Sequence, residues 1–76
     1  MLELYGTASC PYTLQLREEL EWKGEPFTEY DVEQDARAFA RMIAMSGGNC
    51  TVPVLVQGGR IVQTGYEGRG CYVKRA

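Results

Sequence analysis

The first half of the chain alternates a short apolar run with a polar stretch that repeats at helical spacing. Residues 1–5 form an apolar run of the kind that predicts a strand. Residues 12–23 carry Leu16 and Leu20 four positions apart among glutamates, and Gly24 ends the pattern. The sequence therefore predicts a strand followed by a helix.

A second strand and a second helix follow. Residues 26–32 alternate enough to predict a strand. Residues 34–45 place Phe39, Met42 and Ile43 at positions i, i+3 and i+4, and a polar stretch with two glycines comes next. We expect a second helix that ends at the glycines.

The pattern closes with a hairpin. Residues 52–57 are a dense β-branched run, Gly58-Gly59 is a two-residue turn signal, and residues 60–64 return as an antiparallel strand. The order is β-α-β-α-β-β within a single domain, residues 1–76. Strands joined by helices imply a parallel unit, so we expect an α/β fold with a mixed four-stranded sheet and helices packed against it.

Composition narrows the class of protein. A chain of 76 residues, 45% of them hydrophobic, has enough apolar residues for one small core. The net charge is −2 and the basic residues are scattered, so the sequence has no basic cluster of the kind that binds nucleic acid. The chain has no secretory signal pattern and no apolar run of membrane-spanning length. We expect a cytoplasmic protein that binds neither nucleic acid nor a membrane.

The first chemical motif is Cys10-Pro11-Tyr12-Thr13, where the first strand gives way to the first helix. Proline suits the first helical turn and has no N–H to donate, so Pro11 fixes the helix start and leaves Cys10 at the N-cap. Unpaired N–H groups and the positive end of the helix dipole then face the sulfur and lower its pKa. Since the thiolate is the nucleophile in thiol–disulfide exchange, Cys10 is the candidate catalytic residue.

The other two cysteines, Cys50 and Cys71, make an odd total of three, and the chain has no histidine. This count argues against a disulfide scaffold and against a zinc site within one chain. Each is either a reactive thiol or a small, partly buried apolar residue.

Two further motifs join the first. Thr51-Val52-Pro53 opens the third strand, and Gly65-Tyr66-Glu67 follows the last one. Together with the cysteine motif they resemble the glutaredoxin branch of the thioredoxin superfamily over nearly the whole chain, which implies a thioredoxin-like fold. In that family the proline is cis and faces the active cysteine, and the backbone before it binds glutathione like an added strand.

The resemblance also implies further glutathione contacts. The amides of Gly65, Tyr66 and Glu67 correspond to a nest for the γ-glutamyl carboxylate. Tyr12 corresponds to the aromatic residue that covers bound glutathione. The chain lacks the lysine that many glutaredoxins carry upstream of the cysteine, so Arg37 or Arg41 is the candidate partner of the glycyl carboxylate.

The chain is shorter than is usual for the family at its C-terminal end. Glutaredoxins usually have a third helix after the glycine motif, whereas residues 66–73 leave room here for only a truncated one, interrupted by Gly68 and Gly70. Part of the sheet is then bare, which raises the chance of dimerisation or of partner docking, and we expect a monomer or a weak dimer.

Thr13 stands where a dithiol enzyme has its second cysteine, so the cysteine motif itself cannot resolve the intermediate. The simplest cycle is monothiol. Cys10 attacks glutathionylated proteins or small mixed disulfides, and glutathione, as cosubstrate, releases it. Cys71, or less readily Cys50, is the alternative resolving residue. The motif with its terminal Gly-Arg-Gly-Cys is also similar to a bacterial glutaredoxin-like group, the UXX-star family, some of whose members have selenocysteine at the position of Cys10.

Two other functions compete with a glutathione-linked oxidoreductase. Monothiol glutaredoxins can hold a [2Fe–2S] cluster between two subunits, with the active cysteine of each and two glutathione molecules as ligands. Such carriers typically have Cys-Gly-Phe-Ser, and Pro11 departs from this motif. A noncatalytic thioredoxin-fold binding module is the second alternative.

Overall fold

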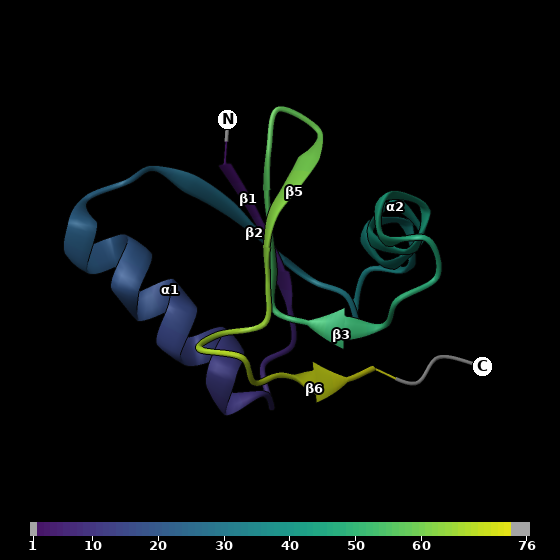
Figure 1. Cartoon of the computed structure of the whole chain (residues 1–76), viewed down its shortest axis with the longest axis horizontal. Helices are drawn as coiled ribbons and strands as arrows, with labels where there is room; N and C mark the ends of the chain where they lie inside the picture. The colour runs from purple at the N-terminus through teal and green to yellow at the C-terminus, as the bar shows by residue number, and fades with distance from the viewer. Residues whose placement is uncertain (1, 74–76) are drawn as a thin grey trace.

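The computed structural model describes residues 2–73, and its elements follow the predicted order as far as the hairpin (Figure 1). The elements are β1 (Leu2–Gly6), α1 (Pro11–Lys23), β2 (Phe27–Asp31), α2 (Ala36–Ser46), β3 (Thr51–Val52), β4 (Val54–Gln57), β5 (Arg60–Thr64) and β6 (Cys71–Tyr72). The run predicted as one strand over residues 52–57 is two strands, because Pro53 separates β3 from β4.

The main sheet has four strands in the order β2-β1-β4-β5. β1 is parallel to β2 and antiparallel to β4, and β4 forms a hairpin with β5. The mixed four-stranded sheet is therefore confirmed. Its parallel pair comes from the crossover through α1, and its antiparallel pairs come from the second half of the chain.

The two helices cover opposite faces of this sheet (Figure 1). Neighbouring residues of a strand point to opposite faces, and β1 shows this directly. Leu4 packs with Leu16 and Leu20 of α1, whereas Tyr5 belongs to the cluster that includes Met42 of α2. The core is thus divided by the sheet into two clusters, one under each helix.

Local signals explain where the helices begin and end. α1 opens with proline, as predicted, and closes at Gly24 in the left-handed conformation. α2 starts after Asp35, whose carboxylate accepts hydrogen bonds from the N–H groups of Arg37 and Ala38 at 3.0 and 3.1 Å. This cap places the start of α2 two residues later than the apolar spacing alone predicted. No helix within residues 2–73 is long and apolar enough to cross a membrane.

The expected truncated third helix is wrong for the described residues. Glu67 and Gly68 both have positive φ, 53° and 77°, and a bridge joins Tyr66 to Arg69. Two successive left-handed residues reverse the chain in a tight turn, which a helix cannot accommodate. The chain then enters β6, so a turn and a short strand occupy the place expected for the helix.

β6 pairs with β3 rather than with the main sheet. The preceding turn lies beside α1, where the Tyr66 ring packs against the α1 cluster and its hydroxyl donates to Glu19 at 3.1 Å. Tyr66 therefore covers part of the sheet face next to α1.

Candidate active site

Cys10 lies at the junction of β1 and α1. Its backbone is extended, its carbonyl accepts the hydrogen bond of Leu14 N–H at 3.2 Å, and Pro11 is the first helical residue. The sequence prediction of an N-cap cysteine is therefore confirmed. The positive end of the α1 dipole faces this position and favours negative charge there. Cys10 is also buried, with 2% of its surface exposed.

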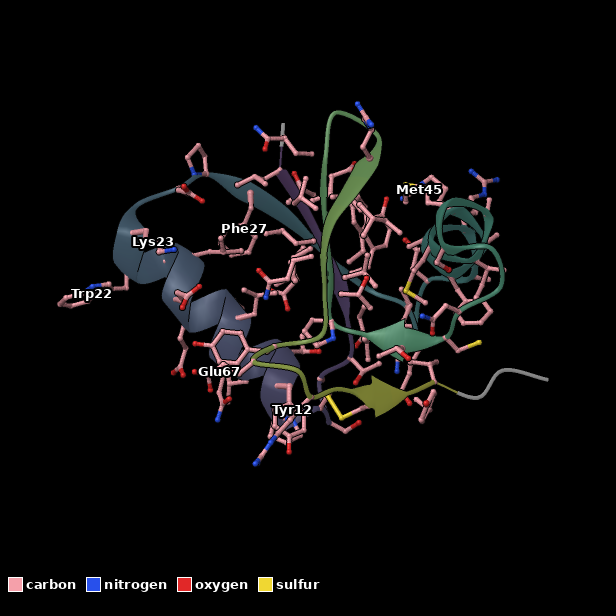
Figure 2. All side chains as sticks on the ribbon, in the orientation of Figure 1. Tyr12, Trp22, Lys23, Phe27, Met45 and Glu67 are labelled. Atoms are coloured by element: carbon pink, nitrogen blue, oxygen red, sulfur yellow. A yellow bond between two sulfur atoms is a disulfide. The ribbon has the colours of Figure 1, made fainter. Side chains whose placement is uncertain are left out.

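A disulfide joins Cys10 to Cys71 across 61 residues of sequence, with a Cα–Cα separation of 6.1 Å. Figure 2 shows this bond at the end of α1 that carries Tyr12, next to β6. Strand pairing brings the second cysteine there, because Cys71 lies opposite Val52 in the β3–β6 ladder. Val52 is buried in the same cluster as Cys10.

Two glycines allow the C-terminal segment to come this close. Gly65 has a φ of 79° and its N–H donates to the Pro53 carbonyl at 2.7 Å. At Gly70, an added Cβ would lie 2.6 Å from the Val52 carbonyl oxygen. A larger residue at Gly70 would push β6 away from β3 and would move Cys71 away from Cys10.

Thr13, the fourth residue of the cysteine motif, is buried against Gly6 of β1. Its hydroxyl oxygen is buried and has no hydrogen-bond partner. Thr13 also lines a cleft of about 140 Å³ beside the first turns of α1, together with Thr7, Ala8, Leu14, Arg17 and Glu29. Its position under the loop that carries Cys10 gives this residue a packing role.

The other predicted residues near Cys10 gather at the same end of the molecule. Tyr12 is partly buried and, like Cys71, packs against the cluster that contains Cys10. The Val52–Pro53 bond is cis, as the resemblance implied. The backbone edge of Thr51 and Val52, where the resemblance places glutathione, is paired with the chain's own β6 in this structure.

The glycine motif after β5 is likewise engaged within the chain. In addition to the bond from Gly65 to Pro53, the Tyr66 N–H donates to the Arg69 carbonyl at 2.6 Å. Two of the amides expected to form the carboxylate nest therefore hold the C-terminal turn in place. Glu67 is exposed at the tip of this turn.

The candidate arginines lie on α2. Arg37 is exposed. Arg41 lies over the stacked rings of Tyr5 and Tyr30, with its guanidinium carbon 5.9 and 4.9 Å from their centroids, and its Nε donates to the Tyr5 hydroxyl at 3.3 Å. Burial is the main reason that the pKa of Tyr5 is raised above its usual value. Arg41 is therefore part of an aromatic cluster that the sequence analysis missed.

Cys50 is a free, half-buried thiol, and its sulfur lies 3.9 Å from the Gly48 carbonyl oxygen. The two candidate resolving cysteines thus differ in the structure, since Cys71 is bonded to Cys10 and Cys50 is not. Within residues 2–73, no group of three or more His, Cys, Asp or Glu side chains could hold a metal ion.

Comparison with known proteins relates the sequence of this chain to glutaredoxins. Residues 2–62 match the family model described as glutaredoxin, a range that ends before Cys71. A curated relative from Synechocystis sp., named as a probable glutaredoxin, is 36% identical over 52 residues, which cover 68% of this chain and 48% of the relative. The chain therefore spans about half the length of that relative.

A similar solved structure is the crystal structure of the glutaredoxin grx-1 from Archaeoglobus fulgidus. Its TM-score is 0.75 at 25% sequence identity, and the match covers 87% of this chain and 75% of that one. The observed arrangement of sheet and helices is thus the thioredoxin-like fold of glutaredoxins.

Proposed function

Because this chain belongs to the glutaredoxin family, we propose that it is a thiol–disulfide oxidoreductase in which Cys10 is the nucleophile and Cys71 is the resolving cysteine. The observation that carries the proposal is the disulfide between these two residues. It pairs the cysteine at the start of α1 with one from a separate strand, in a chain whose motif has threonine in the position of the second cysteine.

In the first half of the cycle, the Cys10 thiolate attacks one sulfur of a substrate disulfide. That disulfide breaks, and its other sulfur leaves as a thiolate and takes up a proton. The Cys71 thiolate then attacks the Cys10 sulfur and releases the second substrate thiolate. Two electrons pass from the protein to the substrate, and the product is the Cys10–Cys71 disulfide seen in the structure.

The local structure suits Cys10 to both of its roles. The helix N-terminus stabilises negative charge on its sulfur, which favours the attacking thiolate and makes Cys10 a good leaving group when glutathione attacks the glutathione sulfur of the Cys10 mixed disulfide. Cys71 belongs to the strand β6 and is not itself the N-cap of a helix. This asymmetry distinguishes the nucleophile from the resolving residue.

The proposed substrates are glutathionylated proteins or small mixed disulfides, with glutathione as the reductant. Family membership supports this substrate class. The proposed glutathione contacts are Tyr12, the segment Thr51–Pro53 and the segment Gly65–Glu67. In the disulfide form β6 pairs with the first two residues of the Thr51–Pro53 segment, so glutathione would contact them only when β6 is displaced.

A turnover assay tests the proposal. The assay follows reduction of a glutathionylated peptide by glutathione, coupled to glutathione reductase, for the wild type, Cys10→Ser and the control Cys50→Ser. We expect Cys10→Ser to lose turnover entirely, because serine provides no thiolate, and Cys50→Ser to keep it. Turnover that persists in Cys10→Ser would exclude Cys10 as the nucleophile.

A further inference from the structure

Tyr66 ties the C-terminal segment to the helix that carries Cys10. Its hydroxyl donates to Glu19 Oε1 of α1 at 3.1 Å, and its ring packs against the α1 cluster. Cys10 caps the start of α1, and Glu19 lies about two and a half turns further along the same helix. We propose that Tyr66 is a positioning residue for Cys71, because it holds the segment on α1 and so keeps the resolving sulfur beside Cys10. This inference rests on the proposed redox pair.

The residues between Tyr66 and Cys71 leave little freedom between the anchor and the sulfur. Tyr66 N–H donates to the Arg69 carbonyl at 2.6 Å, and Arg69 N–H donates back to the Tyr66 carbonyl at 3.0 Å. These two bonds close the turn, so Arg69 is fixed relative to Tyr66. A single residue, Gly70, then separates Arg69 from Cys71. Figure 1 shows this segment reaching α1 before it enters β6, so a displacement of Tyr66 would move the start of β6 with it.

The ladder that attaches β6 to β3 is short. It contains two residue pairs, and the buried residue Val73 adds a hydrogen bond from its N–H to the Cys50 carbonyl at 3.0 Å. An isolated pair of short strands is at best marginally stable in water. Before the disulfide forms, β6 therefore depends on these contacts and on the anchor at Tyr66. The anchor raises the effective concentration of the Cys71 thiolate at a Cys10 mixed disulfide.

The step that Tyr66 supports is the resolution of the Cys10 adduct. The Cys71 thiolate attacks the Cys10 sulfur of the Cys10–glutathione disulfide and forms the Cys10–Cys71 bond. Glutathione leaves as a thiolate and takes up a proton. In the reverse direction, a glutathione thiolate attacks the same Cys10 sulfur and releases Cys71. An anchor that keeps Cys71 close favours the internal disulfide in this equilibrium.

The equilibrium between the dithiol and the internal disulfide tests this inference. It is measured on the full chain with Cys50→Ser as background, by thiol quantification in glutathione buffers and, separately, in buffers of mercaptoethanol and its disulfide. Tyr66→Phe keeps the ring and the backbone amide and loses the hydroxyl. We expect this variant to shift the equilibrium toward the dithiol about tenfold in both buffers, the effect of losing one hydrogen bond to a charged group.

Glu19 and Lys23 provide the matched controls. Glu19→Ala should shift the equilibrium as far as Tyr66→Phe, and the double variant should shift it no further, because both changes remove the same hydrogen bond. Glu19→Gln keeps an acceptor oxygen and should stay within about threefold of the background protein. Lys23→Gln removes the ion pair between Lys23 and Glu19 at 3.7 Å and leaves the Tyr66 bond. Its equilibrium should stay within about twofold, because the ion pair is exposed.

An unchanged equilibrium in Tyr66→Phe would overturn the inference. A shift that occurs in glutathione buffers and not in mercaptoethanol buffers would overturn it as well, because Tyr66 would then act as a contact for glutathione. Failure of the proposed redox pair is recognised separately. In that case the background protein itself forms no bond between Cys10 and Cys71 in either buffer.

Discussion

Pro11 fixes the position of Cys10 relative to α1. It opens α1 and leaves the cysteine at the N-cap. This relation is local, so the tetrapeptide was sufficient to predict it. The partner of Cys10 could not be predicted in this way, because Cys71 is 61 positions away in the sequence and nothing in the intervening residues indicates that the two cysteines are close. Both Cys50 and Cys71 therefore remained candidates at the level of sequence.

Removal of Cys71 is expected to trap the reaction at its intermediate. After treatment with oxidised glutathione, Cys71→Ser should retain a glutathione adduct on Cys10, because no second thiolate is present in β6 to expel it. The wild type should be free of adduct and contain the internal disulfide. Intact-mass analysis distinguishes the two forms, and Cys50→Ser serves as the matched control. A Cys71→Ser protein without adduct would contradict the resolving role.

A second prediction concerns the packing beneath the active-site loop. An added methyl group in Gly6→Ala would overlap the Thr13 side chain. We expect the free energy of unfolding to fall by about 1–3 kcal/mol, the usual cost of overpacking. Urea denaturation measures this change.

The double variant Gly6→Ala/Thr13→Ala tests the cause of that loss. It removes the two Thr13 atoms that lie closest to the added methyl. The loss of unfolding free energy in the double variant should therefore be smaller than the sum of the losses in the two single variants. Strict additivity would show that Thr13 is not the source of the strain.

The aromatic cluster shows where prediction from individual residues fails. Tyr5 and Tyr30 are paired in the register of β1 and β2, and Arg41 reaches them from α2. Each residue had an ordinary local role in the sequence, as a strand or helix position. Their contact depends on strand register and on the helix above it, which a periodicity argument does not supply.

At the scale of elements, the long apolar elements were predicted and the shortest ones were not. β3 and β6 contain two residues each, too few to show any periodicity. The proline that separates β3 from β4 was recognised as a motif, but the run around it was interpreted as one strand. The sequence around Glu67-Gly68 gave only a weak signal for a turn, because the same residues were also compatible with a short helix interrupted by glycines.

The close approach of β6 to β3 can be tested at Gly70. In Gly70→Ala the new Cβ would meet the Val52 carbonyl oxygen at 2.6 Å, so the strands must separate. We expect the equilibrium with a glutathione redox buffer to shift toward the dithiol about tenfold, which corresponds to ~1.4 kcal/mol. Thiol quantification across a series of buffers measures the shift.

Gly68→Asn is the matched control for Gly70→Ala. Gly68 has a positive φ of 77°, which asparagine tolerates, and an added Cβ there would meet nothing within 4 Å. Its dithiol–disulfide equilibrium should remain within about twofold of the wild type, which is ~0.4 kcal/mol. Equal shifts in the two variants would show that the contact between Gly70 and Val52 does not hold the disulfide form together.

For the molecule as a whole, the position of the segment after residue 62 determines where Cys71 lies relative to Cys10. The family match ends at residue 62, and the segment beyond it supplies the turn, β6 and Cys71. Figure 1 shows this segment running beneath the sheet from α1 toward β3. It therefore places a second cysteine beside the first in a fold whose α1 motif contains only one.

The most direct test of the redox pair is a disulfide map of the wild-type chain after oxidation with oxidised glutathione. Tryptic fragments 1–17, 42–60 and 70–74 each contain one of the three cysteines. The account predicts a link between fragments 1–17 and 70–74, with the thiol of Cys50 free in fragment 42–60. A link from 1–17 to 42–60, or stable glutathione on Cys10 without any internal link, would contradict it.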